Sequence, residues 1–135
     1  MYAKYLCPYC KVELNVGGNI VLAARKIHEA GNKGVVLLHE EIGNYTVDMS
    51  GSLKVKEGDV VDFYCPLCLE NLKLEKGENL AHLKHVDRHG KMNDLVLSMK
   101  YGERSTFMVD ENRQITSYGD KISKFIDPEW FLTKQ

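Results

Sequence analysis

The chain has little proline, no surplus of charge of either sign and no long apolar run. Only 3 of its 135 residues are proline, and no tract of biased composition interrupts it. These absences exclude a collagen-like, linker-dominated or disordered chain. No stretch is long enough to cross a bilayer, and the beginning, MYAKYLCPYC, lacks the features of a secretory signal. We therefore expect a cytoplasmic protein that does not bind membranes.

The charges nearly cancel. The 18 basic and 19 acidic side chains leave a formal net charge of -1, so no global field attracts the protein to phosphates or to anionic lipid. Hydrophobic residues make up 44% of the chain and charged residues 27%, which are ordinary proportions for a globular protein. A chain of this length can bury one substantial core. We expect a single zinc-binding domain over residues 1–135.

Antiparallel β-structure dominates the expected fold. Apolar and polar residues alternate over 12–16, which predicts a short strand. Four short segments separated by turn residues predict a β-meander over 35–64, and similar patterns predict C-terminal hairpins over 92–118. Together with one or two short helices, these elements predict an α+β fold.

One helix is expected over residues 19–30, NIVLAARKIHEA. Asn19 would cap its beginning and Gly31 would end it. The apolar residues at helical spacing are Ile20, Ala23, Ala24, Ile27 and Ala30. The same segment would also suit a strand.

The second expected helix lies near the C-terminus. Residues 119–127 contain a small apolar stripe and should stop before Pro128. Trp130 and Phe131 are expected to pack onto the sheet. Residues 78–92 fit either a helix or the first strand of a hairpin.

All four cysteines fall into two CPxC units, CPYC at 7–10 and CPLC at 65–68. In a reducing compartment, paired cysteines more often bind metal or do redox chemistry than form disulfides. Zn²⁺ prefers four ligands in a tetrahedron, and each CxxC turn supplies two thiolates with backbone N–H groups directed at the sulfurs. We therefore expect a tetrathiolate site, whose predicted ligands are Cys7, Cys10, Cys65 and Cys68. We call 7–10 knuckle 1 and 65–68 knuckle 2.

The two motifs resemble the knuckles of zinc-ribbon and rubredoxin-like proteins, in which a tetrathiolate metal site lies between two hairpins. The resemblance covers only the knuckles and their flanking strands, and it implies a structural Zn²⁺. Iron binds four thiolates too, but a rubredoxin is a much smaller domain, so zinc is favoured. The long separation of the motifs is closer to that in β-tent proteins such as the yippee-like and cereblon ligand-binding domains, where zinc joins the ends of two sheets. Glycine often follows the second cysteine of a knuckle, whereas this chain has Lys11 and Leu69, which predicts irregular turns.

Two alternatives compete for the cysteines. CPYC is also the active-site sequence of glutaredoxins, where it begins an α-helix that lowers the pKa of the attacking thiol. Here a strand pattern and Gly17-Gly18 follow instead, so a dithiol redox protein or a zinc redox switch is the weaker hypothesis. A different ligand set would combine knuckle 2 with His85 and His89, whose spacing places them one helical turn apart. That set would leave knuckle 1 without partners.

Nothing in the sequence calls for an enzyme, although the question stays open. It contains no GxSxG, phosphate-binding loop, HExxH or dinucleotide fingerprint. We therefore expect a non-catalytic module that binds a protein partner. Nucleic-acid binding is the alternative, because Tyr5, Tyr9 and Lys11 around knuckle 1 would contact bases or phosphates, although nearby glutamates dilute the positive charge.

Overall fold

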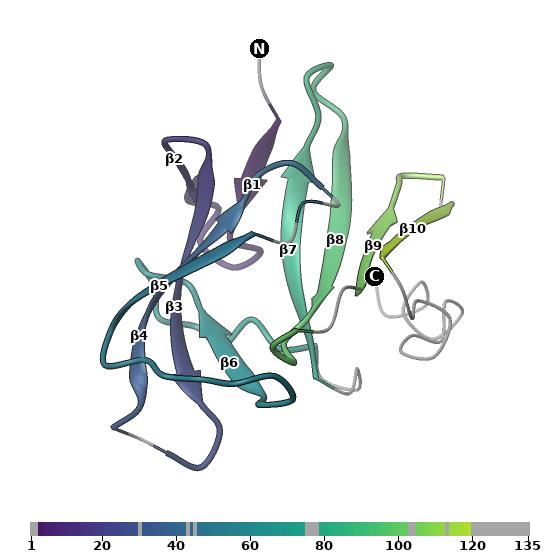
Figure 1. Cartoon of the computed structure of the whole chain (residues 1–135). Coiled ribbons are helices and arrows are strands. Elements are labelled where there is room, and N and C mark those ends of the chain that lie inside the picture. Colours follow the sequence, from purple (N-terminus) through teal and green to yellow (C-terminus); the bar gives the residue numbers. More distant parts are fainter. Residues whose placement is uncertain are drawn as a thin grey trace.

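The computed structural model describes residues 3–29, 31–42, 44, 46–74, 79–102, 105–112 and 114–119. Within these ranges the chain forms ten β-strands and no helix. The strands build two antiparallel sheets, which we call sheet A and sheet B (Figure 1). The expected α+β class is therefore wrong for the described residues, whose fold is all-β. No helix in this part of the chain is long and apolar enough to cross a membrane.

Sheet A contains the beginning and the end of the described chain, in the order β1-β7-β8-β9-β10. Its strands are β1 (Lys4–Leu6), β7 (Leu80–Val86), β8 (Met92–Ser98), β9 (Ser105–Val109) and β10 (Ile115–Gly119). The sequence of residues 78–92 suited either a helix or the first strand of a hairpin. The described part of this segment contains β7 and the turn to β8, so it forms a hairpin.

Sheet B is formed by the strands between the two knuckles. The strands are β2 (Asn15–Val16), β3 (Asn19–Lys26), β4 (Lys33–His39), β5 (Val47–Gly51) and β6 (Val61–Tyr64). Their order is β2-β3-β4-β5, and β6 pairs with β3 as well. The chain thus leaves sheet A at knuckle 1, builds all of sheet B, and returns to sheet A after knuckle 2 (Figure 1).

The helix expected over 19–30 is instead strand β3. Its burial alternates, so that Ile20, Leu22 and Ala24 are buried while the residues between them are only partly covered. β3 has partners at both edges, with β4 along one and β2 and β6 along the other. Two paired edges satisfy the backbone of the whole strand, and this pairing outweighs the helical spacing of the alanines.

The terminal helix expected over 119–127 lies outside the described residues, except for Gly119 at the end of β10. Trp130 and Phe131 also lie outside them. These two expectations therefore stay predictions.

Buried side chains from both sheets form one continuous core cluster. Sheet A contributes Tyr5, Leu83, Leu95 and Met108, and sheet B contributes Ile20, Leu22, Val36 and Phe63. A second, smaller cluster of buried residues comes from positions of opposite parity in sheet A: Leu80, Val96, Phe107 and Val109. Sheet A is therefore apolar on both faces, whereas the core side chains of sheet B share one face.

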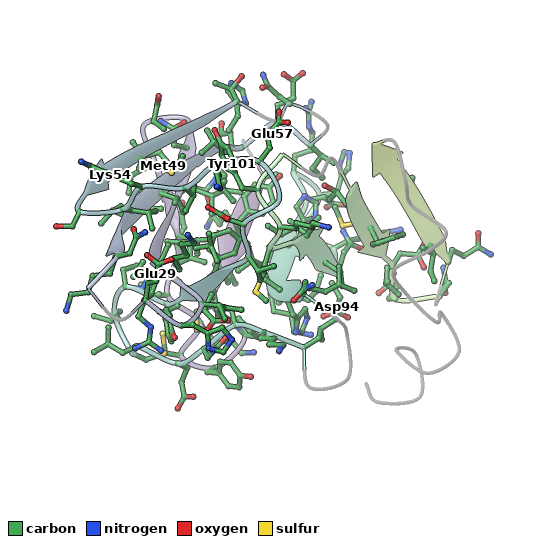
Figure 2. The ribbon with its side chains drawn as sticks, turned by 60° about the horizontal axis from the view of Figure 1, so that its bottom comes forward. Glu29, Met49, Lys54, Glu57, Asp94 and Tyr101 are labelled. Atoms are coloured by element: carbon green, nitrogen blue, oxygen red, sulfur yellow. The ribbon has the colours of Figure 1, made fainter. Side chains whose placement is uncertain are left out.

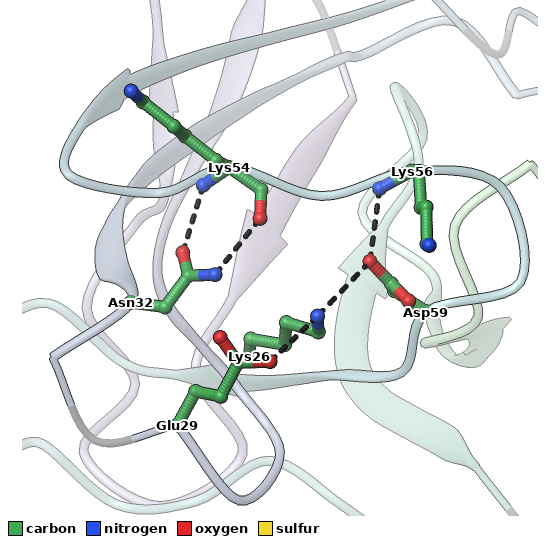
Figure 3. Close-up of polar contacts among 6 residues, drawn as sticks. All are labelled: Lys26, Glu29, Asn32, Lys54, Lys56 and Asp59. Carbon is green, nitrogen blue, oxygen red and sulfur yellow. Dashed lines mark hydrogen bonds and ion pairs between the residues drawn. The ribbon is translucent and has the colours of Figure 1, made fainter.

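Residues 52–60 connect β5 to β6, and we call this segment the strap. The side chain of Asn32 donates to the carbonyl of Lys54 at 2.8 Å and accepts its N–H at 2.7 Å. Lys26 Nζ lies 3.4 Å from a carboxylate oxygen of Asp59. Figure 3 shows that these contacts fasten the strap to the end of β3 and to the turn that precedes β4.

Candidate metal centre

Each knuckle is the turn of a short hairpin. Antiparallel bridges join Leu6 to Glu13 around knuckle 1 and Tyr64 to Asn71 around knuckle 2. The expected arrangement of strand, CPxC turn and strand therefore occurs twice. One hairpin begins in β1 of sheet A and the other in β6 of sheet B, so the two sheets meet at the knuckles.

The two turns have matching backbone geometry. The N–H of Lys11 donates to the carbonyl of Cys7 at 3.0 Å, and that of Leu69 donates to the carbonyl of Cys65 at 2.9 Å. Lys11 and Leu69 adopt φ values of 65° and 63°. Both residues thus take the left-handed conformation that glycine usually provides, and the irregularity expected from their side chains does not occur.

Backbone N–H groups surround the first sulfur of each knuckle. Cys7 Sγ accepts from Tyr9 and Cys10 at 3.3 and 3.4 Å. Cys65 Sγ accepts from Leu67 and Cys68 at the same two distances. Cys7 and Cys65 are completely buried, whereas Cys10 and Cys68 are exposed. The site therefore has a buried side, where turn dipoles stabilise negative sulfur, and an outer side that faces solvent.

The four sulfurs have the spacing of a tetrahedral metal site. Cys7 Sγ lies 3.7 Å from Cys68 Sγ, and Cys10 Sγ lies 3.7 Å from Cys65 Sγ. All four sulfurs lie within 4.8 Å of one another. A tetrahedron with Zn–S bonds of about 2.3 Å has edges of about 3.8 Å, so the cluster fits one ion. A disulfide would need about 2.05 Å, and all four cysteines are free.

Comparisons of the chain with protein-family models, curated proteins and solved structures found no match. The interpretation of the cysteine cluster therefore rests on its own geometry.

The thiols of the cluster differ in acidity. Burial raises the pKa of Cys65, but the backbone N–H groups of Cys68 and Leu67 and the thiols of Cys10 and Cys68 together lower it to about 7. The N–H of Glu70 lowers the pKa of Cys68, but lost hydration and the neighbouring thiols raise it to about 12. Four thiolates this close repel one another, and a bound cation would compensate their charge.

The alternative ligands His85 and His89 do not join the cluster. His85 is buried, its ring centroid lies 5.2 Å from that of Tyr5, and its Nδ1 lies 3.0 Å from the amide nitrogen of Asn93. Burial lowers the pKa of His85. His89 is exposed in the turn between β7 and β8. Among the described residues, the group that can hold a metal ion consists of the four cysteines.

Of the three residues expected to contact nucleic acid, Tyr5 is buried, whereas Tyr9 and Lys11 are exposed. Tyr5 is only 1% exposed and its hydroxyl donates to the carbonyl of Glu40 at 2.6 Å, so it cannot stack on a base. A further basic residue of this part of the chain, Lys84 in β7, forms an ion pair with Asp94 at 2.6 Å, which reduces the positive charge that it would offer to a phosphate.

An apolar surface at the knuckles was not foreseen. Tyr9 is 58% exposed, and Leu67 and Leu69 are each 67% exposed. The sequence contained a signal for this, because a side chain in or beside a four-residue metal-binding turn has little protein to cover it. We call Tyr9, Leu67 and Leu69 the knuckle patch.

Glycine at either left-handed position should stabilise the protein. Lys11→Gly or Leu69→Gly removes a Cβ that is unfavourable at positive φ, so we expect the free energy of unfolding of the metal-loaded protein to rise by about 1 kcal/mol. Denaturant titration measures this change. Lys11→Ala is the matched control, since it loses the lysine side chain but keeps Cβ, and equal stability of the two Lys11 variants would contradict the expectation.

Proposed function

We propose that the protein is a zinc-binding protein in which one structural Zn²⁺ is held by all four cysteines. The observation that supports this most strongly is the tetrahedral spacing of four sulfurs from two matching hairpins. Such a closed site leaves no coordination position for water, so the ion stabilises the fold and does no Lewis-acid chemistry. Zinc is favoured over iron because the rubredoxins, which bind iron with four thiolates, are much smaller domains than this chain. The reducing cytoplasm, where we place the protein, keeps the thiols available.

The position of the ion explains what it would stabilise. Knuckle 1 follows β1 of sheet A directly, and knuckle 2 follows β6 of sheet B directly. An ion bound to both knuckles therefore joins the two sheets at the point where the chain passes between them. This arrangement is similar to the one implied by the β-tent resemblance.

The further task that we propose is binding of a protein partner by the knuckle patch. Three large and exposed side chains lie in or directly beside the two knuckles, whose sulfurs lie within 4.8 Å of one another, and exposed apolar side chains that are grouped together are common at protein interfaces. The charged side chains beside it are of both signs, with Lys11 and Glu70 as exposed examples. Mixed charge suits the rim of a protein interface better than a phosphate backbone.

Metal analysis of the purified protein tests the first part. We expect one zinc per chain, and loss of the metal in both pair variants, Cys7→Ser with Cys10→Ser and Cys65→Ser with Cys68→Ser. Full metal content in the first pair variant would overturn the four-cysteine site. Cys7 should also resist alkylation until a chelator is added, whereas a dithiol redox protein would react at once.

Affinity capture with the zinc-loaded protein tests the second part. The double variant Leu67→Ser, Leu69→Ser should lose the partners that the natural sequence retains, while its zinc content and melting temperature stay unchanged. Met92→Ser is the control, because Met92 is also exposed (45%) but lies in β8, near the far hairpin turn. Capture of the same proteins by the double variant would contradict the proposal. Binding of nucleic-acid probes that weakens steeply with salt would favour the alternative.

A further inference from the structure

A cavity of about 310 Å³ lies between the two sheets, away from the cysteines. Six of the apolar side chains that line it come from strands of both sheets: Ile20, Val36, Leu38, Phe63, Leu95 and Leu97. The volume is about twice that of a cavity that accepts one benzene molecule, and it lies at the lower end of the range for small-molecule sites. The cavity is partly open to solvent, so a small molecule can enter it.

The strap closes one side of this cavity. Its residues Val55 and Glu57 belong to the lining. The N–H of Gly58 donates to the carbonyl of Tyr101 at 3.0 Å, and the N–H of Tyr101 donates to the carbonyl of Asp59 at 2.8 Å. The strap, which starts in sheet B, is thereby hydrogen-bonded to the segment that follows β8. Three of the lining residues are labelled at the same end of the molecule in Figure 2: Met49 of β5, Glu57 of the strap and Tyr101 after β8.

The lining residues Glu40, Glu41, Glu57 and Lys100 give the cavity more acidic than basic side chains. Glu40, Glu41 and Glu57 contribute three carboxylates, whereas Lys100 contributes one ammonium group. Glu41, Glu57 and Lys100 are exposed, so they mark where the cavity opens to solvent. Within the described ranges, no ion pair engages Glu41 or Glu57.

His39 also lines the cavity, and its Nδ1 accepts the N–H of Glu41 at 3.0 Å. At the opening two exposed carboxylates, Glu41 and Glu57, stand against the one ammonium group of Lys100. These three side chains have a net negative charge, which favours a positively charged group.

We propose that this cavity binds a small molecule with an apolar body and a basic amine. The apolar body would fill the space between the sheets, and the amine would lie at the opening near Glu41 or Glu57. This site is separate from the cysteine cluster, so it does not depend on the proposed zinc function.

Three probes that share one apolar body test the proposal on the full, zinc-loaded chain. Phenylbutylamine has a positive end, phenylbutanol a neutral end and phenylbutanoate a negative end. Titration followed by methyl NMR should shift the signals of Ile20, Leu38 and Leu95. The amine should bind about tenfold more tightly than the carboxylate, with the alcohol between them. Absence of these shifts with all three probes, or equal affinity for the amine and the carboxylate, would overturn the proposal.

Two variants test separately how the apolar cavity and the carboxylates at its opening contribute to binding. Leu38→Trp fills the cavity and should abolish binding of all three probes. The double variant Glu41→Gln, Glu57→Gln changes only exposed side chains, so it should fold normally, bind the alcohol as before and lose the preference for the amine. If Leu38→Trp does not fold, the affinities of the double variant Glu41→Gln, Glu57→Gln test the proposal on their own. An unchanged preference of this variant for the amine over the carboxylate would refute the role of the two carboxylates.

Discussion

Removing the metal from the purified protein should unfold most of the described β-structure and not the knuckles alone. Binding of structural Zn²⁺ contributes about 10–16 kcal/mol to folding in zinc-finger peptides, whereas whole domains are stable by only about 5–15 kcal/mol. Loss of the ion would leave four close thiols of which Cys7 and Cys65 are completely buried. We therefore expect the metal-free chain to be largely unfolded at room temperature.

Circular dichroism during titration with a chelator measures this unfolding. The β-signal should disappear together with the metal and return when one equivalent of zinc is added back. Magnesium is the control, because it prefers oxygen ligands and should restore nothing. An unchanged melting temperature in protein shown to contain no metal would contradict the structural role.

Single ligand variants should differ according to burial. Cys65→Ser removes a buried sulfur that accepts two backbone N–H groups, whereas Cys68→Ser removes an exposed one. Both changes lose a ligand, but the first also leaves two backbone N–H donors with a poorer partner, so it should lower the melting temperature more. The same order is expected for Cys7 and Cys10.

Gly34→Ala should lower the free energy of unfolding by about 3 kcal/mol, the upper part of the usual range for overpacking. A Cβ on Gly34 would lie 2.0 Å from the carbonyl oxygen of Ser50 and 3.1 Å from Cβ of Leu53. The first neighbour is backbone of β5, which cannot rotate away as a side chain would. β4 and β5 would have to separate at this point, next to the strap.

Gly31→Ala is the matched control. Gly31 is an exposed glycine shortly before β4, and a Cβ there would meet nothing within 4 Å. Its substitution should change stability by no more than about 0.5 kcal/mol. Denaturant titration of both variants measures the difference, and equal stabilities would show that the contact with Ser50 is relieved without cost.

The candidate metal site could be predicted from the sequence because its chemistry is local. Two cysteines in one tight turn already define half a site, so the four residues were identified without knowledge of the fold. The left-handed conformation of Lys11 and Leu69 could not be predicted, since their side chains disfavour it. In both turns the residue with positive φ donates its N–H to the carbonyl of the first cysteine, so the conformation is tied to the closure of the turn.

The error at β3 has a different origin. Over residues 19–26 the apolar side chains satisfy both a helical and an alternating pattern, and only the strands at its two edges decide between them. Those partners are distant in sequence: Ala24 pairs with Phe63. The cavity was equally inaccessible, because its lining extends from Tyr5 to Thr106 and no local pattern predicts a space between two sheets.

The insertion of sheet B between two strands of sheet A has a consequence for folding kinetics. Tyr5 of β1 must find His85 of β7, whereas β7 to β10 can form from successive hairpins. Closing so long a loop in the unfolded chain is slow and costs entropy that grows with its length. An ion bound to both CPxC units closes most of that loop in advance, as a reversible cross-link would. The supply of metal should then govern how quickly the first strand finds its place, and not only how firmly it is held there.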